Sequence, residues 1–378
     1  MNKEYLIIAG ESSGDLHGSA LMKEMLDQNK DLSFFGVGGN NMIDAGLTNI
    51  YHNKDLAFLG FAEVVKHIPF IKKVQKEIIE ECKKRKITSA ILIDYPGFNL
   101  GLAKKLHKIG VKIFYYISPQ IWAWGGKRIH KIKKLVDKMI VVFPFEKELY
   151  ENAGVDVEFV GHPLIERINE YKFTKKEEFF AVNGLNKTKE ILLVMPGSRE
   201  QEIEKIFPAA INAAKTLSRK FDLQIVVACA SNIDEQKLLT LGGNSDFSVI
   251  KDSTYELLKY SKFGIIKSGT STMEAGIFEL PCVVVYVTSK LSYAIGKRLV
   301  KIDHIAMANI ILGERVVDEL LQEEVTENNI VKCSEKVLLD KSLYDQTKHK
   351  LSGIRKILGN KNASFEAASL ILNVDGKK

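Results

Sequence analysis

The stretch Ile191-Leu192-Leu193-Val194-Met195-Pro196-Gly197-Ser198-Arg199 joins an apolar run to a glycine turn, and a polar segment begins at Glu200. Five apolar residues in a row are too few for a helix and are typical of a buried strand. After the turn, apolar residues recur at steps of three and four: Ile203, Ile206, Phe207, Ala210, Ala213, Ala214 and Leu217. This spacing predicts an amphipathic helix, and therefore a strand–turn–helix unit of an α/β fold.

The glycine turn is a candidate site for an anion. Free N–H groups and the helix dipole at a helix start attract negative charge, here beside Gly197 and Ser198. The guanidinium of Arg199 can bind a phosphate through two hydrogen bonds. A turn that only joins strand and helix, with Arg199 in solvent, explains the local pattern equally well.

Length and composition are those of an ordinary globular protein. The 378 residues are 46% hydrophobic and 27% charged, and their number favours two domains. The four cysteines lack metal-ligand or disulfide spacing, which fits a reducing compartment, and we expect neither a metal nor a cofactor. We find no signal peptide and no apolar run near the roughly 20 residues of a membrane span. The net charge of +7 favours an anionic partner: nucleic acid, phosphorylated substrate or acidic lipid.

The N-terminus repeats the strand–turn–helix pattern. The apolar run 5–9 leads into Gly10-Glu11-Ser12-Ser13-Gly14-Asp15, which matches neither a dinucleotide nor a P-loop motif. Acidic residues suit sugar hydroxyls better than phosphates, so we expect sugar contacts from Glu11, Ser12, Ser13, Gly14 and Asp15. The alternative is a tight turn with a helix cap.

Residues 57–82 form the most amphipathic part of the chain, with apolar residues on one stripe and lysines around it. This pattern suits a helix in an anionic membrane interface, kinked at Pro69. The expected membrane or acyl contacts are Phe58, Leu59, Phe61, Val65, Ile68 and Ile71. A helix packed on the core with a solvated lysine face is the alternative.

Two strand ends carry further candidates. Asp94 follows the apolar run 90–93, where open α/β sheets bind ligands, so burial would suit it as a general base. A structural Asp that caps the next helix is the alternative. Trp122 and Trp124 lie in one loop before a basic helix, where they could stack on sugars, bind acyl chains, hold single-stranded nucleic acid or simply edge the core.

Several of these segments resemble motifs of the lipid-A-disaccharide synthase family. They are Gly10–Asp15, Ser118–Trp124, Phe143–Glu146, Gly161–Leu164, Pro196–Arg199, Ser268–Thr270 with Glu274, and Asn309 to Glu323. The resemblance covers nearly the whole chain in order, and its SPxxWAW loop is the most specific part. It implies a GT-B fold, in which two Rossmann-like domains face an interdomain cleft. It also implies a cytoplasmic enzyme, peripheral to the inner membrane.

The resemblance implies three segments. Residues 1–165 form an acceptor and membrane-facing domain, and 166–340 form a UDP-sugar donor domain. Residues 341–378 form helices that return to the first domain or exchange between subunits, so a homodimer is one assembly to consider. Strands expected near 224–229, 264–266 and 281–287 agree with this plan.

The implied reaction joins UDP-2,3-diacylglucosamine to 2,3-diacylglucosamine 1-phosphate with inversion and releases UDP. Asp94 is the expected base, without a metal, because the chain has no D-x-D pair. The expected donor site comprises Gly197, Ser198, Arg199, Ser268, Gly269, Thr270, Glu274, Asn309, Gln322 and Glu323. Ser271 and Glu274 also have capping-box spacing, which would explain Glu274 by structure alone.

The chain departs from the family pattern at three places. Gly97 stands where an acidic residue is common, Met307-Ala308 precedes Asn309 in place of Leu-Pro, and residues 287–290 are less basic. Two other classes stay open: another GT-B enzyme, such as a UDP-sugar epimerase or a transferase for a different lipid-linked sugar, and a nucleic-acid binder. No RNA-binding signature supports the latter, so we expect no nucleic-acid partner.

Overall fold

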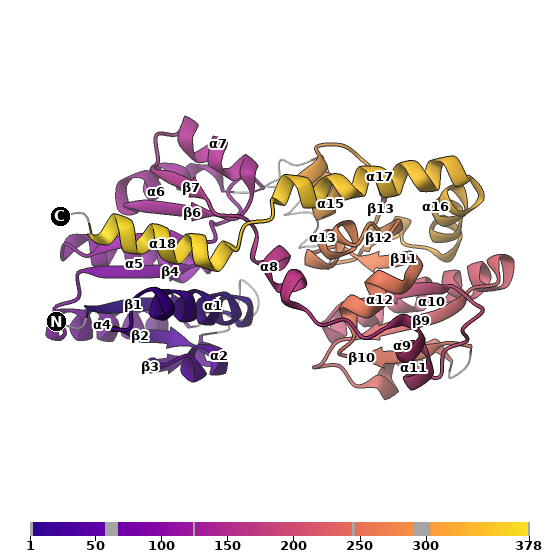
Figure 1. The fold of residues 1–378 in the computed structure, drawn as a ribbon, viewed down its shortest axis with the longest axis horizontal. Coiled ribbons are helices and arrows are strands. Elements are labelled where there is room, and N and C mark those ends of the chain that lie inside the picture. Colours follow the sequence, from indigo (N-terminus) through magenta and orange to yellow (C-terminus); the bar gives the residue numbers. More distant parts are fainter. Residues whose placement is uncertain are drawn as a thin grey trace. The chain divides into compact units, whose positions relative to one another are not determined.

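The computed structural model describes residues 3–56, 67–123, 125–243, 246–289, 293 and 303–376. The chain forms two compact units, shown together in Figure 1. The first comprises residues 1–167 and 358–378, and the second comprises residues 168–357.

The first unit is built on a parallel sheet of seven strands in the order β3-β2-β1-β4-β5-β6-β7. The strands are short apolar runs, as expected for a parallel sheet that is covered on both faces. They are β1 (Lys3–Ala9), β2 (Leu32–Gly38), β3 (Leu47–His52), β4 (Ser89–Ile93), β5 (Lys112–Tyr116), β6 (Lys138–Val141) and β7 (Val157–Phe159).

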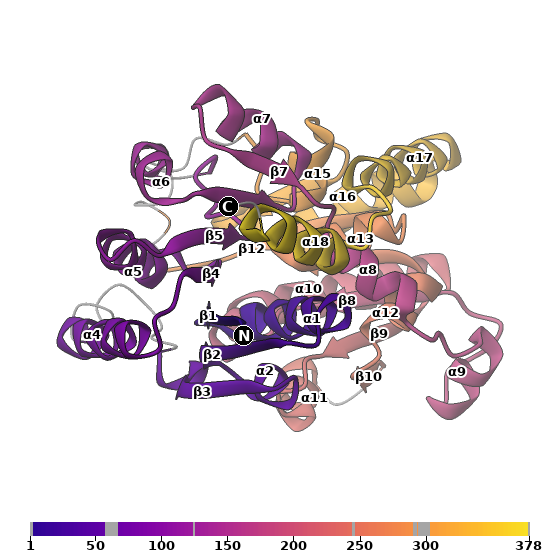
Figure 2. The ribbon, with the colours of Figure 1, turned by 60° about the vertical axis from the view of Figure 1, so that its left-hand side comes forward.

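Helices cover both faces of this sheet. Side chains at alternate positions of β1, such as Leu6 and Ile8, enter a core with helices α4, α5, α6 and α7. Figure 2 shows α4, α5 and α6 along one side of the strands and α1 and α18 along the other. The helices of this unit are α1 (Ser12–Gln28), α2 (Asn40–Asp44), α4 (Ile68–Lys84), α5 (Pro96–Lys108), α6 (Ile129–Leu135), α7 (Pro144–Asn152) and α18 (Ala363–Gly376). Short 3₁₀ turns occur at η1 (Asn53–Asp55) and η2 (Gly126–Arg128). The helix α8 (Pro163–Glu170) leads from this unit into the second.

The second unit repeats the plan with six parallel strands in the order β10-β9-β8-β11-β12-β13. They are β8 (Ile191–Met195), β9 (Gln224–Cys229), β10 (Ser248–Lys251), β11 (Ser261–Lys267), β12 (Cys282–Tyr286) and β13 (Asp318–Leu321). Its helices are α9 (Lys176–Val182), α10 (Glu200–Phe221), α11 (Glu235–Gly242), α12 (Thr254–Tyr260), α13 (Thr270–Ile277), α15 (Met307–Leu312), η3 (Gln322–Glu324), α16 (Glu327–Leu339) and α17 (Lys341–Leu358). The apolar stripe predicted for residues 203–217 is buried on α10.

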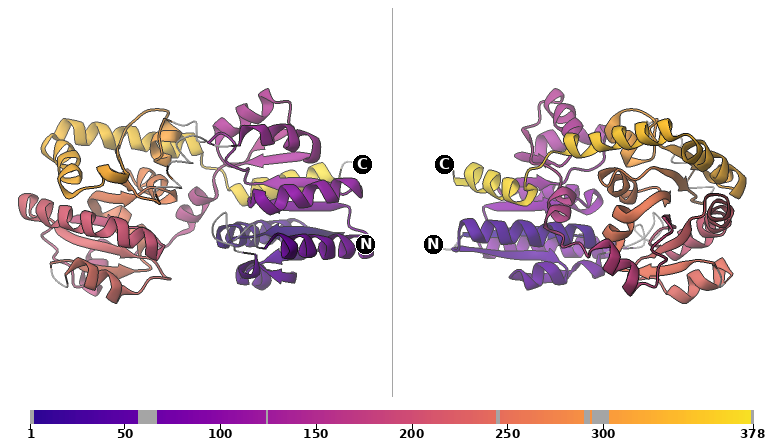
Figure 3. Two further views of the ribbon diagram at one scale, coloured as in Figure 1. Left: turned by 180° about the vertical axis from the view of Figure 1, so that it is seen from behind. Right: turned by 45° about the vertical axis from the view of Figure 1, so that its right-hand side comes forward.

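The two last helices belong to different units. In the second unit α17 packs on α13, where a Cβ on Gly276 would lie 2.2 Å from the Ile354 side chain. Figure 3 shows the C-terminal helices, in yellow, from two further sides. In the first unit α18 packs beside α1. The carboxylate of Asp375 on α18 accepts a hydrogen bond from Ser89 at 2.7 Å and forms an ion pair with Lys3 at 2.6 Å. The helix α18 therefore belongs to the first unit, whereas α17 belongs to the second.

The predicted amphipathic segment is described only from His67 onward. Pro69 lies in the first turn of α4, where Pro is tolerated because N–H groups need no helical partner. The part of the predicted kinked helix that would precede Pro69 lies outside the described residues. Val74, Ile78 and Cys82 of α4 are buried, and Lys72, Lys73 and Lys76 are exposed. Within the described ranges, no helix combines the length and the apolarity that crossing a membrane requires.

Candidate active site

Both sheets have a topological switch point where the strand order reverses. In the first unit it lies between β1 and β4, and in the second between β8 and β11. Ligands of open α/β sheets bind at the carboxyl ends of such strand pairs. The candidate residues Glu11 and Asp94 follow β1 and β4, whereas the turns 196–199 and 268–270 follow β8 and β11.

Asp94 is held in an unusual backbone conformation at the end of β4. Asp94 and Tyr95 both have positive φ, 42° and 45°, a region that costs non-glycine residues roughly 1–2 kcal/mol each. Two side chains hold the Asp94 carbonyl: Tyr115 Oη donates to it at 2.6 Å and Asn99 Nδ2 at 2.8 Å. The strained turn is thus fixed from both sides, which orients the Asp94 carboxyl. The helix α5 begins after Tyr95, whose side chain makes no cap, and the Asp94 carboxylate contacts the backbone of Tyr95 itself.

Burial raises the pKa of Asp94 to about 6, and the negative charge of Glu11 adds to the rise. The ring of Tyr95 closes this corner, since its hydroxyl donates to the Leu56 carbonyl at 2.6 Å. A Cβ on Gly10 would lie 2.2 Å from that ring, so only glycine fits there. Asp94 is therefore a carboxylate with a pKa close to the useful range of a general base.

The acidic turn after β1 contains both exposed and buried residues. Glu11, Ser12 and Ser13 are exposed, whereas Gly14 and Asp15 are buried. Asp15 accepts four hydrogen bonds at 2.7–3.1 Å, from the N–H groups of Gly39, Asn41 and Met42 and from the Asn41 side chain. Its carboxylate thus holds the start of α2, and its oxygens are engaged there rather than directed to a sugar.

The glycine turn of the second unit lies beside a charged cluster. Gly197 has φ 122°, and a Cβ there would lie 2.7 Å from Glu202 Oε2. Glu202 Oε1 pairs with Lys267 Nζ at 2.9 Å and with Arg199 Nη1 at 3.5 Å. The Lys267 and Glu202 side chains are only 19% and 14% exposed, so their pairing is shielded from solvent, whereas Arg199 is 68% exposed. This arrangement brings two cations to the turn and fixes one of them.

The second turn, Ser268–Thr270, opens α13 with Gly269 at φ 143°. Ser268 Oγ donates to the Ile305 carbonyl at 2.9 Å, and Thr272 Oγ1 accepts the N–H of Met307 at 2.9 Å. The helix begins after Gly269 without a side-chain cap, so the capping box that the sequence allowed for Ser271 and Glu274 is absent. Glu274 is partly exposed on the first turns of α13.

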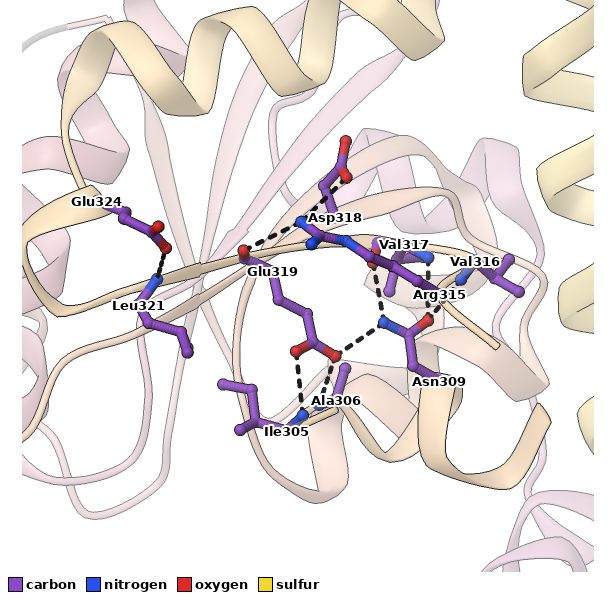
Figure 4. A network of polar contacts seen from close by, with 10 residues as sticks. All are labelled: Ile305, Ala306, Asn309, Arg315, Val316, Val317, Asp318, Glu319, Leu321 and Glu324. Carbon is purple, nitrogen blue, oxygen red and sulfur yellow. Dashed lines mark hydrogen bonds and ion pairs between the residues drawn. The ribbon is translucent and has the colours of Figure 1, made fainter. Parts of the chain in front are cut away.

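Asn309 lies at the centre of the polar network drawn in Figure 4. Its side chain donates to the Val317 carbonyl and to Glu319, and it accepts the N–H groups of Val316 and Val317, all at 2.8–3.0 Å. Glu319 in turn accepts the N–H groups of Ile305 and Ala306, each at 3.0 Å. Asn309 is fully buried, so its side chain supports the segment 305–317.

The remaining predicted donor residues lie just after β13. Gln322 has φ 52° and accepts the N–H of Thr288 at 3.3 Å, whereas Glu323 is exposed. The structure therefore brings Gly197, Arg199, Lys267 and Ser268–Thr270 to neighbouring strand ends. It gives Asn309 and Gln322 supporting contacts within the same unit.

The aromatic loop after β5 is described up to Ala123. Trp122 is partly buried and packs edge-on against Phe145 with ring centroids 5.3 Å apart. Trp124 lies outside the described residues, as do Phe58, Leu59, Phe61 and Val65 of the expected membrane contacts. Of the others, Ile68 is 40% exposed and Ile71 is partly buried on α4.

Comparison with known proteins identifies the family. A family model described as lipid-A-disaccharide synthetase matches residues 5–373. The chain is 40% identical to the lipid-A-disaccharide synthase of Geobacter metallireducens, over 100% of this chain and 98% of that one. The identity to the enzyme of the same name from Myxococcus xanthus is 35%, over 98% and 97% of the two chains. The chain belongs to the lipid-A-disaccharide synthetase family. The resemblance noted from its motifs is thereby confirmed.

Solved structures agree on the fold of this lipid-A-disaccharide synthetase family member. UDP-GlcNAc 2-epimerase from Neisseria meningitidis, bound to UDP-GlcNAc, has a TM-score of 0.67 at 12% identity, covering 99% of this chain and 100% of that one. The calicheamicin glycosyltransferase CalG4 has a TM-score of 0.65 at 13% identity, covering 100% and 99%. At such low identity the likeness concerns the fold alone, and the predicted GT-B class is confirmed.

Four charged residues near the candidate sites were not predicted from the sequence as site residues: Glu146, Glu202, Lys267 and Glu319. Lys267 directly precedes Ser268 at the end of a predicted strand, a position that could have drawn attention. Glu202 and Glu319 acquire their roles only through partners on other elements, and no local pattern marks them. Among the described residues, no group of three or more His, Cys, Asp or Glu side chains could hold a metal ion.

Proposed function

We propose that this protein joins UDP-2,3-diacylglucosamine to 2,3-diacylglucosamine 1-phosphate with inversion and without a metal. The products are the β-1,6-linked lipid A disaccharide 1-phosphate and UDP. Family membership over residues 5–373 supports synthesis of a lipid A disaccharide. The observation that carries the chemistry is Asp94, whose pKa is raised by burial to about 6 at the switch point of the first sheet.

In the acceptor half of the reaction, Asp94 is the general base. Above pH 6 its carboxylate is ionised and accepts the proton of the acceptor's 6-hydroxyl. The oxygen attacks the anomeric carbon of the donor, and the bond to the β-phosphate oxygen of UDP breaks. The bonding electrons leave with UDP, and the configuration at the anomeric carbon inverts. The exposed Glu11, Ser12 and Ser13 and the Trp122 loop are the proposed sugar contacts.

In the donor half, the second unit binds UDP and stabilises the charge that develops on it. Arg199 and the turns at Gly197 and Ser268–Thr270 supply a guanidinium and backbone N–H groups for the diphosphate. Lys267, paired with Glu202, adds a second cation. Glu274 is the proposed ribose contact. Asn309 and Gln322 would act through the segments that they support, and the exposed Glu323 could contact the ligand directly.

The lipid substrates call for work at a membrane surface. The net charge of +7 and the exposed Lys72, Lys73 and Lys76 on α4 support attraction to anionic lipid of the inner membrane, on its cytoplasmic face. Co-sedimentation with anionic vesicles tests this part. Retention that is lost with neutral vesicles or at high salt is the expected result, and equal binding to both vesicle types would contradict it.

The decisive experiment measures UDP release from the diacyl donor and acceptor, with and without a chelator. We expect chelator-resistant turnover that falls on the order of 10³-fold in Asp94→Asn, with UDP affinity unchanged. Near-normal turnover of that variant would overturn the base assignment. Loss of turnover on chelation, restored by a divalent cation, would overturn the metal-free mechanism. UDP released from the donor alone, with an altered free sugar, would indicate an epimerase.

A further inference from the structure

Three sequence motifs that the proposed mechanism leaves without a shared role meet at one edge of the first unit. They are the loop after β5, the segment after β6 and the segment after β7. Phe145 packs against both Trp122 and Phe143, each with ring centroids 5.3 Å apart, and Phe143 lies 4.9 Å from the His162 ring. One aromatic cluster therefore joins the ends of three adjacent strands.

Glu146 lies at the polar centre of this cluster. It is only 1% exposed, on the first turn of α7. Its Oε1 accepts hydrogen bonds from Ser118 Oγ at 2.6 Å and from Trp122 Nε1 at 3.2 Å. Its Oε2 is buried without a hydrogen-bond partner among the residues that the structure describes. A buried carboxyl with an unsatisfied oxygen carries a free-energy penalty, so it calls for an explanation other than stability.

The loop that Glu146 holds begins in a strained conformation beside the proposed base. Ile117 has φ 62°, a value that β-branched residues rarely adopt. The residue before it, Tyr116, accepts the N–H of Asp94 at 3.0 Å through its carbonyl. The strained residue thus separates the backbone contact of Asp94 from Ser118, the first residue that Glu146 contacts. Such strain persists only where surrounding contacts fix it.

We propose that Glu146 is a positioning residue that fixes the Ser118–Trp122 loop for sugar binding and keeps the adjacent strand end beside Asp94 in place. It acts through Ser118 and Trp122 rather than by touching the substrate. The contact between Glu146 and the loop is independent of the reaction. Only the effect on turnover rests on the proposed function.

The charge of Glu146 provides a way to observe this contact. Burial raises the pKa of Glu146 to about 7, against the contacts that lower it, from Ser118, Trp122 and the backbone of Phe143 and Val142. The polar side chains that face it in the described chain are those of Ser118, Trp122, Tyr150 and, beyond Phe143, His162. Burial raises the pKa of Tyr150 and lowers that of His162 to about 3, so both stay neutral near pH 7. Ionisation of Glu146 strengthens the bonds from Ser118 and Trp122 because their acceptor becomes charged.

Tryptophan fluorescence reports on this loop alone, because Trp122 and Trp124 are the only two tryptophans of the chain. We expect the emission of the full-length protein to change between pH 5.5 and 8.5, with a midpoint within about one unit of 7. Glu146→Gln keeps a carbonyl acceptor but cannot ionise, so it should abolish the change. Glu148→Gln removes an exposed charge from the same helix, and His130→Gln removes an exposed imidazole near the loop. Both controls should retain the change.

Two outcomes of the titration would overturn the proposal: a wild type without a transition, or a Glu146→Gln variant that keeps it. Glu146→Ala should also raise acrylamide quenching of the tryptophans, because Ser118 and Trp122 lose their acceptor. If Glu146→Ala does not fold, the pH titration of Glu146→Gln still tests whether Glu146 holds the loop.

The activity arm uses UDP release with both sugar substrates. For Glu146→Gln we expect a KM for the sugar substrates raised at least about threefold, with UDP affinity unchanged and no neutral-pH dependence of KM. An unchanged KM together with a lost fluorescence transition would limit Glu146 to holding the loop and would overturn its role in sugar binding. A wild type that releases no UDP would contradict the proposed function, while the titration would still test the contact.

Discussion

In the first unit, the turn after β1 lies beside two carboxylates, Glu11 and Asp94, whereas in the second unit the turn after β8 lies beside the cations of Arg199 and Lys267. Both turns occupy the switch point of a parallel sheet, and the two sheets share one strand order over six strands. In the proposed function, the shared backbone plan sets where each ligand binds, and the local charges set which chemistry follows. An acidic edge suits proton transfer, and a basic edge suits a departing diphosphate.

The same contrast separates two aspartates within the first unit. Asp15 accepts four hydrogen bonds from the start of α2, whereas burial and the nearby Glu11 raise the pKa of Asp94. One carboxylate is satisfied by its surroundings and supports the fold. The other is buried near a like charge, which raises its pKa towards the range that the proposed base needs.

The largest effect on stability is expected for the satisfied carboxylate. Asp15→Ala should lower the free energy of unfolding by about 3 kcal/mol, because it leaves the N–H groups of Gly39, Asn41 and Met42 without their acceptor. Urea unfolding at pH 7.5 measures the change. Asp27→Ala, which removes an exposed charge from the same helix, should change stability by less than about 0.5 kcal/mol. Equal stability of the Asp15→Ala and Asp27→Ala variants would show that the Asp15 carboxylate does not stabilise the fold.

The basic edge is tested next by Lys267→Met. We expect UDP to bind about tenfold more weakly, because one of the two cations beside the turn is lost and Glu202 keeps its charge. Calorimetric titration with UDP measures the dissociation constant. Lys262→Met is the matched control, since Lys262 lies at the other end of β11 and pairs with Glu190. An unchanged UDP affinity would remove Lys267 from the donor site.

Asp94→Asn should stabilise the first unit above pH 6, by up to about 3 kcal/mol at pH 8. The pKa of Asp94 is raised from 3.8 to about 6 in the folded protein, so the folded state binds more protons than the unfolded state between these values. The wild type therefore loses stability as pH rises through that window, and the variant does not. Unfolding free energies measured from pH 4 to 8 test this, and parallel curves for the two proteins would contradict the buried charge.

The smallest effect is expected for Glu11→Gln. Removing the charge of Glu11 should move the acidic limb of the pH profile of kcat/KM downward by less than about one unit, because burial is the larger cause of the raised Asp94 pKa. Glu80→Gln, on the exposed face of α4, should leave the limb in place. An upward shift or none would indicate that Glu11 does not act on Asp94.

Most of the fold follows from local patterns in the sequence. Apolar runs of about five residues and the turns after them predict the strands, and therefore also the position of Asp94 and of the glycine turns at strand ends. The order of strands within each sheet does not follow from such runs. That order is known only from the structure, whereas the family resemblance predicted the GT-B class, which the comparisons confirm.

The roles of single polar residues were harder to predict, because their partners lie far along the chain. The sequence predicts that Asp15 contacts a sugar. In the structure its carboxylate oxygens accept hydrogen bonds from residues that lie 24–27 positions later in the chain. Asn309 belongs to a family motif that predicts a contact with the donor, yet its side chain hydrogen-bonds to the Val317 carbonyl and Glu319 of the second unit. Glu146 is part of a quoted motif, but only the fold brings it to Ser118 and Trp122. The catalytic and ligand-binding assignments themselves stay predictions.

The return of α18 to the first unit has a consequence for how the protein is made. Residues 358–376 are synthesised after the whole of the second unit, yet their Asp375 is tied to Lys3 and Ser89, and Lys112 donates to the Val374 carbonyl at 2.7 Å. When the first 167 residues have left the ribosome, one of the helices that cover their sheet has therefore not yet been synthesised. The sheet face that α18 covers stays exposed while some 190 further residues are translated, and chaperones can protect it during this interval.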